Sequence, residues 1–431
     1  MNLLIKNGRV IDPSQPFDAV ADVLISDGKI KAVGFDLGEA DEVFDATGMV
    51  VAPGFVDIHV HGRTPGQEYK EDTTTLTAAA AAGGFSTVCV MPNTIPTIDC
   101  RSVVEDILSR ARTEGNGVRI LPIASVSVAA KNEQLTEFGE LKDSGAVAVS
   151  DDAFPVQDAD FLRRTFRYAK TLGLVTMLHC EDIALTGGGH AGVGKGGGVM
   201  NEGQVSMEMG LRGMPRVSEE LAVYKACALA RDEGARVHIL HVSTKGGVDV
   251  VRAFKAAGAP VTAEAGPHHF GLTDEAVRGY NTNAKMNPPL RTKEDCEAII
   301  AGFEDGTIDC IATDHAPHAA REKDREFDAA PFGIIGIETC LPVSLQVLVE
   351  QGPLDLPSLV FLMSTRPAQV LEIDAGTLQV GARADICAFD PNERWTVSEE
   401  ELRSKSKNTP WLGKTMTGRA KATWVDGKRV L

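Results

Sequence analysis

Two histidines, His59 and His61, lie two residues apart at the end of the apolar run 54–61. In a β-strand alternate side chains point to the same face, so both imidazoles aim the same way. Neutral imidazole is a common ligand for zinc and similar metals. An HxH pair also arises by chance on protein surfaces, so a metal site requires further ligands elsewhere in the chain.

Ligand-type residues recur at the ends of other apolar runs. The further candidates are Asp151, Asp152, His179, His241 and Asp314. A single histidine that ends a strand is more often an ordinary polar residue than a ligand. Five strands that supply such residues at the same end favour a metal centre. Mixed histidine and carboxylate ligation suits Zn²⁺ with an open position for water, or two metals that share a bridging carboxylate.

A centre of this kind performs metal-assisted hydrolysis or its reverse. A bound metal lowers the pKa of water from about 15.7 to about 7, and the resulting hydroxide attacks a polarised carbonyl. A carboxylate then carries the proton to the leaving nitrogen. Asp314 is our candidate for this proton shuttle, because it is the carboxylate of the last strand beside the histidines. The alternative is that Asp314 is a ligand only.

The elements that must position these residues alternate between strand and helix. Eight short apolar, β-branched runs predict strands at 54–59, 87–91, 118–124, 146–150, 175–179, 237–241, 261–264 and 309–313. Helices are expected between them at 73–82, 102–113, 158–171, 218–233, 245–257 and 293–303. Eight βα units fit a (β/α)8 TIM-type barrel, whose active site lies at the C-terminal strand ends. An open doubly wound sheet is the alternative, but no GxGxxG motif directly follows a predicted strand.

The two ends of the chain have a different pattern. Both consist of short strands and turns, so we expect them to build one small β-sandwich-like subdomain together. The expected division is 1–52 for the N-terminal part of this subdomain, 53–365 for the barrel and 366–431 for the C-terminal part.

Composition excludes several classes of function. The chain has 431 residues, a net charge of -17 and no Lys/Arg-rich run, so we expect neither nucleic-acid nor membrane binding. An anionic substrate then requires local cations, either metals or a placed arginine. The eight cysteines form no CxxC pair, which favours reduced thiols in a cytoplasmic protein. No apolar run approaches the ~18 residues of a membrane span.

Stretches around the candidate residues resemble the dihydroorotase family of the amidohydrolase superfamily, in its bacterial class I type. Arg63 and PGQE (65–68) follow the first match, and Lys323 follows the ATDHAPH stretch. The matches in chain order are DIHVH (57–61), MPNT (91–94), HCED (179–182), HVST (241–244), KMNPPL (285–290), ATDHAPH (312–318) and PFG (331–333). The resemblance covers nearly the whole chain.

The resemblance implies a hydrolase with one or two Zn²⁺ ions that interconverts N-carbamoyl-L-aspartate and L-dihydroorotate in pyrimidine biosynthesis. The implied metal ligands are His59, His61, Asp152, His179, His241 and Asp314. Asp152 is the expected bridge between two metals, with Asp151 as the alternative. A homodimer is also expected, and a complex with aspartate transcarbamoylase is left open.

Substrate binding is implied for a second set of residues, namely Arg63, Asn93, Asn287, His318, Phe332 and Gly333. The substrate carries carboxylates, and the planar fork of arginine pairs with one in two-point fashion. The alternatives are that Arg63 is an ordinary surface residue and that Asn287 caps the turn at the following prolines.

Two other functions compete with this interpretation. A cyclic amidase of the dihydropyrimidinase, hydantoinase or allantoinase type usually has a carboxylated lysine at the end of strand four. Here that end reads SDD (150–152), and Lys142 precedes the strand. A non-catalytic dihydroorotase-like partner of aspartate transcarbamoylase is expected to lack ligands, whereas this chain keeps them all. We also expect the glycine-rich stretch 187–198 to form a lid-like surface loop.

Overall fold

The computed structural model describes residues 2–188 and 196–431, and its centre is a parallel barrel. The barrel strands in spatial order are β6 (Phe55–Val60), β7 (Phe85–Val90), β8 (Arg119–Ser125), β9 (Ala148–Ser150), β10 (Thr176–Leu178), β13 (Val237–Ile239), β14 (Val261–Ala265) and β15 (Cys310–Ile311). Beyond β15 the chain returns to β6, where the His61 backbone N–H donates to the His315 carbonyl at 2.9 Å. The barrel is therefore nearly closed, and all eight predicted strands are confirmed.

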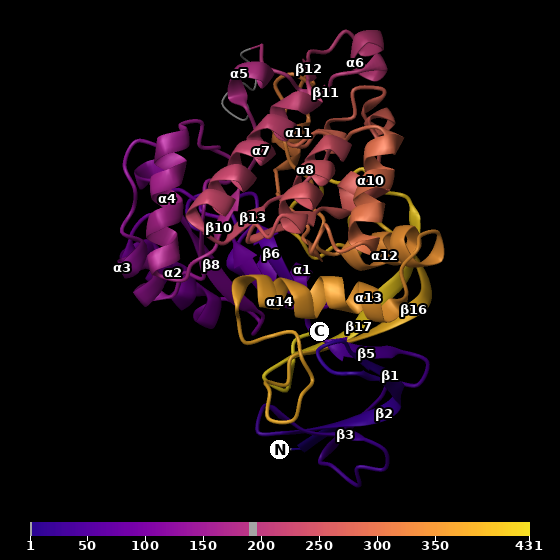
Figure 1. Ribbon diagram of the computed structural model, residues 1–431. Coiled ribbons are helices and arrows are strands. Elements are labelled where there is room, and N and C mark those ends of the chain that lie inside the picture. Colours follow the sequence, from indigo (N-terminus) through magenta and orange to yellow (C-terminus); the bar gives the residue numbers. More distant parts are fainter. Residues whose placement is uncertain (1, 189–195) are drawn as a thin grey trace.

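Helices between the strands cover the outside of the barrel (Figure 1). The six predicted helices are confirmed as α1 (Thr73–Ala82), α2 (Arg101–Thr113), α4 (Ala159–Thr171), α7 (Arg216–Glu233), α8 (Lys245–Ala256) and α10 (Lys293–Glu304). Local capping explains where several begin. Asp72 accepts a hydrogen bond from the Thr75 N–H at the start of α1, and Asp158 does the same for Phe161 in α4.

Shorter elements lie in the connections. They are α3 (Phe138–Ser144), α5 (Ile183–Thr186), β11 (Met200–Asn201), α6 (Gln204–Met209), β12 (Gly213–Met214), α9 (Pro267–Gly271), α11 (Ala320–Lys323), α12 (Cys340–Ser344), α13 (Leu356–Val360) and α14 (Arg366–Leu371). Residues 189–195 of the predicted glycine-rich loop, His190 among them, lie outside the described residues. In the described ranges, no helix has the length and apolar character that crossing a membrane demands.

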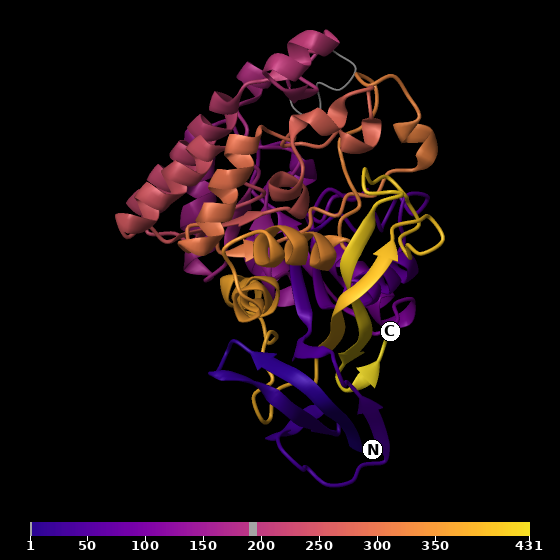
Figure 2. The same cartoon turned by 90° about the vertical axis from the view of Figure 1, so that its right-hand side faces the viewer.

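The two chain ends share one sheet beside the barrel, as predicted (Figures 1 and 2). Its strands are β1 (Asn2–Asp12), β2 (Phe17–Ser26), β3 (Lys29–Gly34), β4 (Glu42–Asp45), β5 (Val50–Pro53), β16 (Ile386–Thr396), β17 (Thr415–Val425) and β18 (Lys428–Arg429). The order is β18-β17-β16-β5-β1-β2-β3, with β4 paired to β1. The strands form one continuous mixed sheet around a core that includes Trp424, where a sandwich would have two facing sheets.

The predicted domain boundaries remain predictions. Only Gly54 separates β5 of the terminal sheet from β6 of the barrel. At the other boundary, Ala368, Val370 and Leu371 of α14 belong to the same buried cluster as Val56 and Ile58 of β6. Because this helix packs into the barrel, we propose that the second boundary falls after α14 and not after residue 365.

Candidate active site

The six predicted metal ligands lie together at the C-terminal ends of the barrel strands, and all six are buried. Three overlapping groups have ligand atoms within 4.8 Å of one another. The groups are His59 with His61 and Asp152, Asp152 with His179 and His241, and His59 with His241 and Asp314. Residues separated by up to 255 positions in the sequence therefore meet in one cluster, as the strand ends predict.

Asp152 lies between two pairs of histidines. Its Oδ2 atom is 3.7 Å from His59 Nε2 and 3.5 Å from His61 Nε2. Its Oδ1 atom is 3.6 Å from both His179 Nδ1 and His241 Nε2. Each carboxylate oxygen thus faces a different pair, which is the arrangement that a carboxylate bridging two metal ions requires.

Asp151 has a different environment from its neighbour. Its Oδ1 accepts a hydrogen bond from the His179 backbone N–H at 3.0 Å, and its Oδ2 accepts one from Val156 at 2.7 Å. Burial raises the pKa of Asp151 to about 7, against the effect of these two hydrogen bonds. Since both carboxylate oxygens of Asp151 accept hydrogen bonds from backbone N–H groups, the geometry favours Asp152 over Asp151 as the bridging residue.

Asp314 faces both the histidines and the adjacent cavity. Its Oδ1 is 2.9 Å from His61 Nε2 and 3.4 Å from His59 Nε2. Burial disfavours its charge, but the neighbouring His59 and His61 lower the pKa of Asp314 well below its usual range. Asp314 and His241 both have positive φ, 48° and 31°, a region that non-glycine residues rarely adopt and that recurs at functional sites.

The cluster fits a metal ion by the chemistry of its donors. His59 Nε2 and Asp152 Oδ2 are buried and have no hydrogen-bond partner among the described residues. Buried polar atoms are normally paired, so a cation between these donors would complete their interactions. Burial opposes a charge on His59, yet Glu264, Asp314 and Asp152 raise its pKa well above the usual value. The site is thus rich in negative charge where a cation would bind.

A carboxylate behind His59 fixes the orientation of its ring, and sequence reasoning gave it no role. Glu264 Oε1 lies 2.6 Å from His59 Nδ1, and Glu264 Oε2 lies 3.0 Å from His238 Nε2. This leaves His59 Nε2 facing the cluster, as is usual for metal-binding histidines. The available signal was a carboxylate at the end of the apolar strand 261–264, level with the other ligands.

A second carboxylate, Glu181, contacts the His179 ring. The sequence analysis gave it no role, although it lies in the HCED stretch. Its Oε2 is 3.0 Å from His179 Nε2 and accepts a hydrogen bond from Asn287 Nδ2 at 2.8 Å. Asn93 Oδ1 similarly lies 2.9 Å from His61 Nδ1. The two predicted substrate-binding asparagines therefore connect the cavity wall to the residues of the cluster.

A cavity of about 180 Å³ opens directly onto the cluster. It is lined by every predicted substrate-binding residue, together with part of the cluster: His61, Arg63, Asn93, Asp152, His241, Asn287, Asp314, Ala316, His318, Pro331, Phe332 and Gly333. The structure thus brings the two predicted sets of residues together at one place.

Arg63 is a buried wall of this cavity and not a surface residue, since only 7% of it is exposed. Its Nε donates to the Pro317 carbonyl at 3.1 Å, and its Nη2 lies 3.3 Å from His318 Nε2. Burial lowers the pKa of Arg63 to about 10, so the guanidinium stays charged at neutral pH. An anionic molecule in this cavity would therefore meet a local positive charge, despite the negative net charge of the chain.

Gly333 allows the chain to approach His318 closely. Its φ is +141°, and an added Cβ would lie 2.9 Å from both Ala316 Cβ and His318 Cδ2. The Gly333 N–H donates to the Lys285 carbonyl at 2.9 Å. A larger residue would push the two lining segments apart.

Comparisons with known proteins show which family the chain is similar to. Residues 48–247 match the family model described as dihydro-orotase-like, and residues 303–431 match the amidohydrolase family. A dihydroorotase from Trichlorobacter lovleyi is 51% identical over 100% of this chain and 99% of its own. One from Geotalea daltonii is 52% identical over the same shares. The structure is also similar to L-hydantoinase (dihydropyrimidinase) from Arthrobacter aurescens, with 27% identity, a TM-score of 0.88 and coverage of 99% and 95%.

Proposed function

The chain belongs to the dihydroorotase family, and from that premise we propose that it interconverts N-carbamoyl-L-aspartate and L-dihydroorotate in pyrimidine biosynthesis. It is a hydrolase that acts on cyclic amides. The observation that carries the proposal is a buried cation, Arg63, in the wall of a cavity that opens onto the histidine and aspartate cluster.

We propose Zn²⁺ as the metal, one or two ions per chain, because mixed histidine and carboxylate ligation suits it. The residues that would hold it are His59, His61, Asp152, His179, His241 and Asp314. When bound, the metal supplies Lewis acidity, which polarises the scissile carbonyl and lowers the pKa of water.

The side chains around the cavity have separate tasks in hydrolysis of the ring. Asp314 takes a proton from the attacking water and delivers it to the ring nitrogen as the C–N bond breaks. Arg63 binds the substrate carboxylate and so fixes which carbonyl faces the cluster. Asn93, Asn287, His318 and the backbone of Phe332 and Gly333 hold the remaining polar groups. Ring closure uses the same contacts in reverse.

The competing cyclic-amidase activity is less well supported, although the fold is shared with a hydantoinase. The end of β9 carries Ser150, Asp151 and Asp152 and has no lysine that could be carboxylated. Neutral hydantoin and dihydrouracil rings also lack the carboxylate that Arg63 would pair with. A purely structural role as a partner of aspartate transcarbamoylase is disfavoured because all six candidate ligands are present.

We further propose that the enzyme is cytoplasmic and forms a homodimer, and that a complex with aspartate transcarbamoylase is worth testing. The free-thiol state of all eight cysteines supports a reducing compartment.

The proposal is tested by turnover of L-dihydroorotate by the purified protein, measured before and after chelation together with its metal content. We expect activity to disappear with the metal and to return when zinc is added. Full activity in protein from which the metal has been removed would refute the proposed metal centre. Failure of zinc, but not of another divalent ion, to restore activity would refute the choice of zinc.

A further inference from the structure

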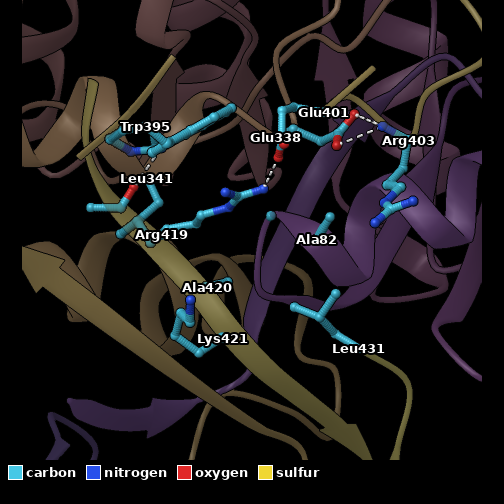
Figure 3. A pocket seen from close by; sticks show the side chains of 13 residues that line it. Ala82, Glu338, Leu341, Trp395, Glu401, Arg403, Arg419, Ala420, Lys421 and Leu431 are labelled. Atoms are coloured by element: carbon cyan, nitrogen blue, oxygen red, sulfur yellow. Dashed lines mark hydrogen bonds and ion pairs between the residues drawn. The ribbon is translucent and has the colours of Figure 1, made fainter. Parts of the chain in front are cut away.

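A segment from the C-terminal part of the chain reaches back to the rim of the substrate cavity. We call residues 402–409, in the connection between β16 and β17, the strap. Its first contact is with Glu338, whose carboxylate accepts hydrogen bonds from the Arg403 N–H at 2.8 and 3.0 Å (Figure 3). The same carboxylate accepts a hydrogen bond from the Ser404 N–H at 3.0 Å. The beginning of the strap is thereby fixed to the barrel just before α12.

The middle of the strap holds the loop that follows Arg63. Ser406 Oγ donates to the Lys70 carbonyl at 2.7 Å. The Lys405 N–H donates to Glu71 Oε1 at 3.1 Å, and its Nζ donates to the Glu68 carbonyl at 2.6 Å. The loop 63–72, which begins with the cavity-lining Arg63, is thus held by residues more than 300 positions away in the sequence.

The end of the strap joins two other segments of the cavity wall through one side chain. Asn408 Oδ1 accepts a hydrogen bond from the His318 N–H at 3.0 Å. Asn408 Nδ2 donates to the Ala316 carbonyl at 3.0 Å and to the Gly333 carbonyl at 3.1 Å. Its own carbonyl accepts from the Ile335 N–H at 3.0 Å. Asn408 is only 3% exposed, so these bonds are made away from water.

We propose that Asn408 is a positioning residue that sets substrate affinity by holding the His318 and Gly333 segments in register. Asn408 does not line the cavity, whereas Ala316, His318 and Gly333 all do. A shift of the His318 segment would also disturb Arg63, because Arg63 Nη2 lies 3.3 Å from His318 Nε2. This inference rests on the proposed function for its kinetic consequence, but the packing role can be measured independently.

The amide group is suited to this position because it offers both an acceptor and two donor hydrogens. An aspartate here would keep the acceptor for the His318 N–H and would set a carboxylate oxygen against two carbonyls. An alanine would leave one buried N–H and two buried carbonyls short of a partner, which disfavours the observed arrangement. Both Asn408→Ala and Asn408→Asp should therefore loosen the same two segments.

Asn116, which is exposed where Asn408 is buried, provides a control that makes hydrogen bonds of the same kind. Its side chain also bridges backbone groups, with Nδ2 donating to the carbonyls of Thr77 at 3.2 Å and Val430 at 3.4 Å, and Oδ1 accepting from Val118 at 3.2 Å. It joins the C-terminal end of the chain to the barrel, but none of its partners lines the cavity. Asn116→Ala should thus lower the stability of the fold without changing the KM for the substrate.

The test compares amide hydrogen exchange, metal content, KM and kcat in the wild-type protein and these variants. We expect Asn408→Ala to speed exchange in peptides covering 313–318 and 331–337, and to raise the KM for L-dihydroorotate at least tenfold. Metal content should stay unchanged and kcat should fall less than KM rises. Asn116→Ala should change neither the exchange of these peptides nor KM.

A milder variant keeps the inference testable where Asn408 substitutions do not fold. Ser406→Ala removes only the bond to Lys70 and should raise KM several-fold. Unchanged exchange and KM in the folded variants would overturn the proposal, as would a loss of thermal stability without a change in KM. A wild-type protein that does not turn over L-dihydroorotate would refute the proposed function, while hydrogen exchange would still decide the role of Asn408.

Discussion

Asp314 occupies a position where a carboxylate can both contact the histidine cluster and reach a molecule in the cavity. It lies 2.9 Å from His61 Nε2 and is part of the cavity wall. Its positive φ of 48° shows that the backbone is held in a strained conformation to direct this side chain. Two roles, ligand and proton carrier, are therefore compatible with one geometry.

Asp314→Asn should reduce kcat about 10²- to 10⁴-fold, the usual contribution of a general acid–base group, because the amide cannot carry the proton. Steady-state kinetics with L-dihydroorotate and metal analysis of the same sample would check this. Asp324→Asn, on an exposed part of the nearby connection, serves as the control. Loss of bound metal in parallel with activity would instead indicate a ligand role alone.

Arg63→Gln should raise the KM for L-dihydroorotate roughly 30-fold or more, since removing one partner of a buried charge pair costs about 2–5 kcal/mol. Arg63→Lys should recover only part of this, because lysine lacks the two-point fork. Arg321→Gln, an exposed arginine of α11, should leave KM unchanged. Equal KM values in wild type and Arg63→Gln would remove the arginine from substrate binding.

The individual strands explain which parts of the site could be predicted from the sequence. Ligands at strand ends were predictable because parallel strands of a barrel bring their C-terminal ends to one mouth. Glu264 was not recognised, since its role depends on closure of the barrel, which brings this side chain of β14 across to β6 and places its Oε1 2.6 Å from His59 Nδ1. Asn408 gave no sequence signal at all, because the partners of its side chain are 75 to 92 positions away.

Glu264→Gln should weaken metal binding about 10- to 100-fold, as is typical when the group that orients a ligand histidine is lost. The physical reason is that His59 Nδ1 would no longer face a carboxylate, which makes the opposite nitrogen a weaker donor. Metal dissociation constants from competition with a chelator would measure the effect. An unchanged dissociation constant would show that the barrel alone orients His59.

Gly333→Ala should lower kcat/KM at least tenfold, because its Cβ would lie 2.9 Å from both Ala316 Cβ and His318 Cδ2. The strain falls on the segments that line the cavity and not on the barrel, so the thermal unfolding midpoint should fall only slightly. Gly306→Ala is a matched control, since Gly306 also has positive φ but meets no atom within 4 Å. Unaltered kinetics in Gly333→Ala would show that these segments can move apart without consequence.

At the scale of the whole molecule, a barrel that carries the site packs beside a sheet built from both chain ends. The sequence predicted the barrel and the shared sheet of the chain ends because both follow from local patterns of strand and turn. It did not predict that the sheet is continuous, or that α14 packs into the barrel, since such packing depends on distant segments. The contacts of the strap could not be predicted for the same reason, because they link the C-terminal part of the chain to distant segments of the cavity wall.

Removal of the metal should lower the thermal unfolding midpoint of the whole protein as well as its activity. A ligand that binds only the folded state stabilises it by about 4 kcal/mol at a thousand times its dissociation constant. Calorimetry before and after chelation, with zinc added back, would record the shift. An unchanged midpoint in metal-free protein would mean that the six buried ligands do not depend on a cation for stability.

We propose that a metal site and Arg63 together select a cyclic amide that carries a carboxylate. The most direct measurement is the ratio of kcat/KM for L-dihydroorotate to that for dihydrouracil, the related ring without the carboxylate. A charge-assisted pair worth about 3 kcal/mol predicts a ratio on the order of 10² or more in favour of L-dihydroorotate. A ratio near one, or a preference for the neutral ring, would show that Arg63 does not select the substrate and would favour a cyclic amidase of the hydantoinase type.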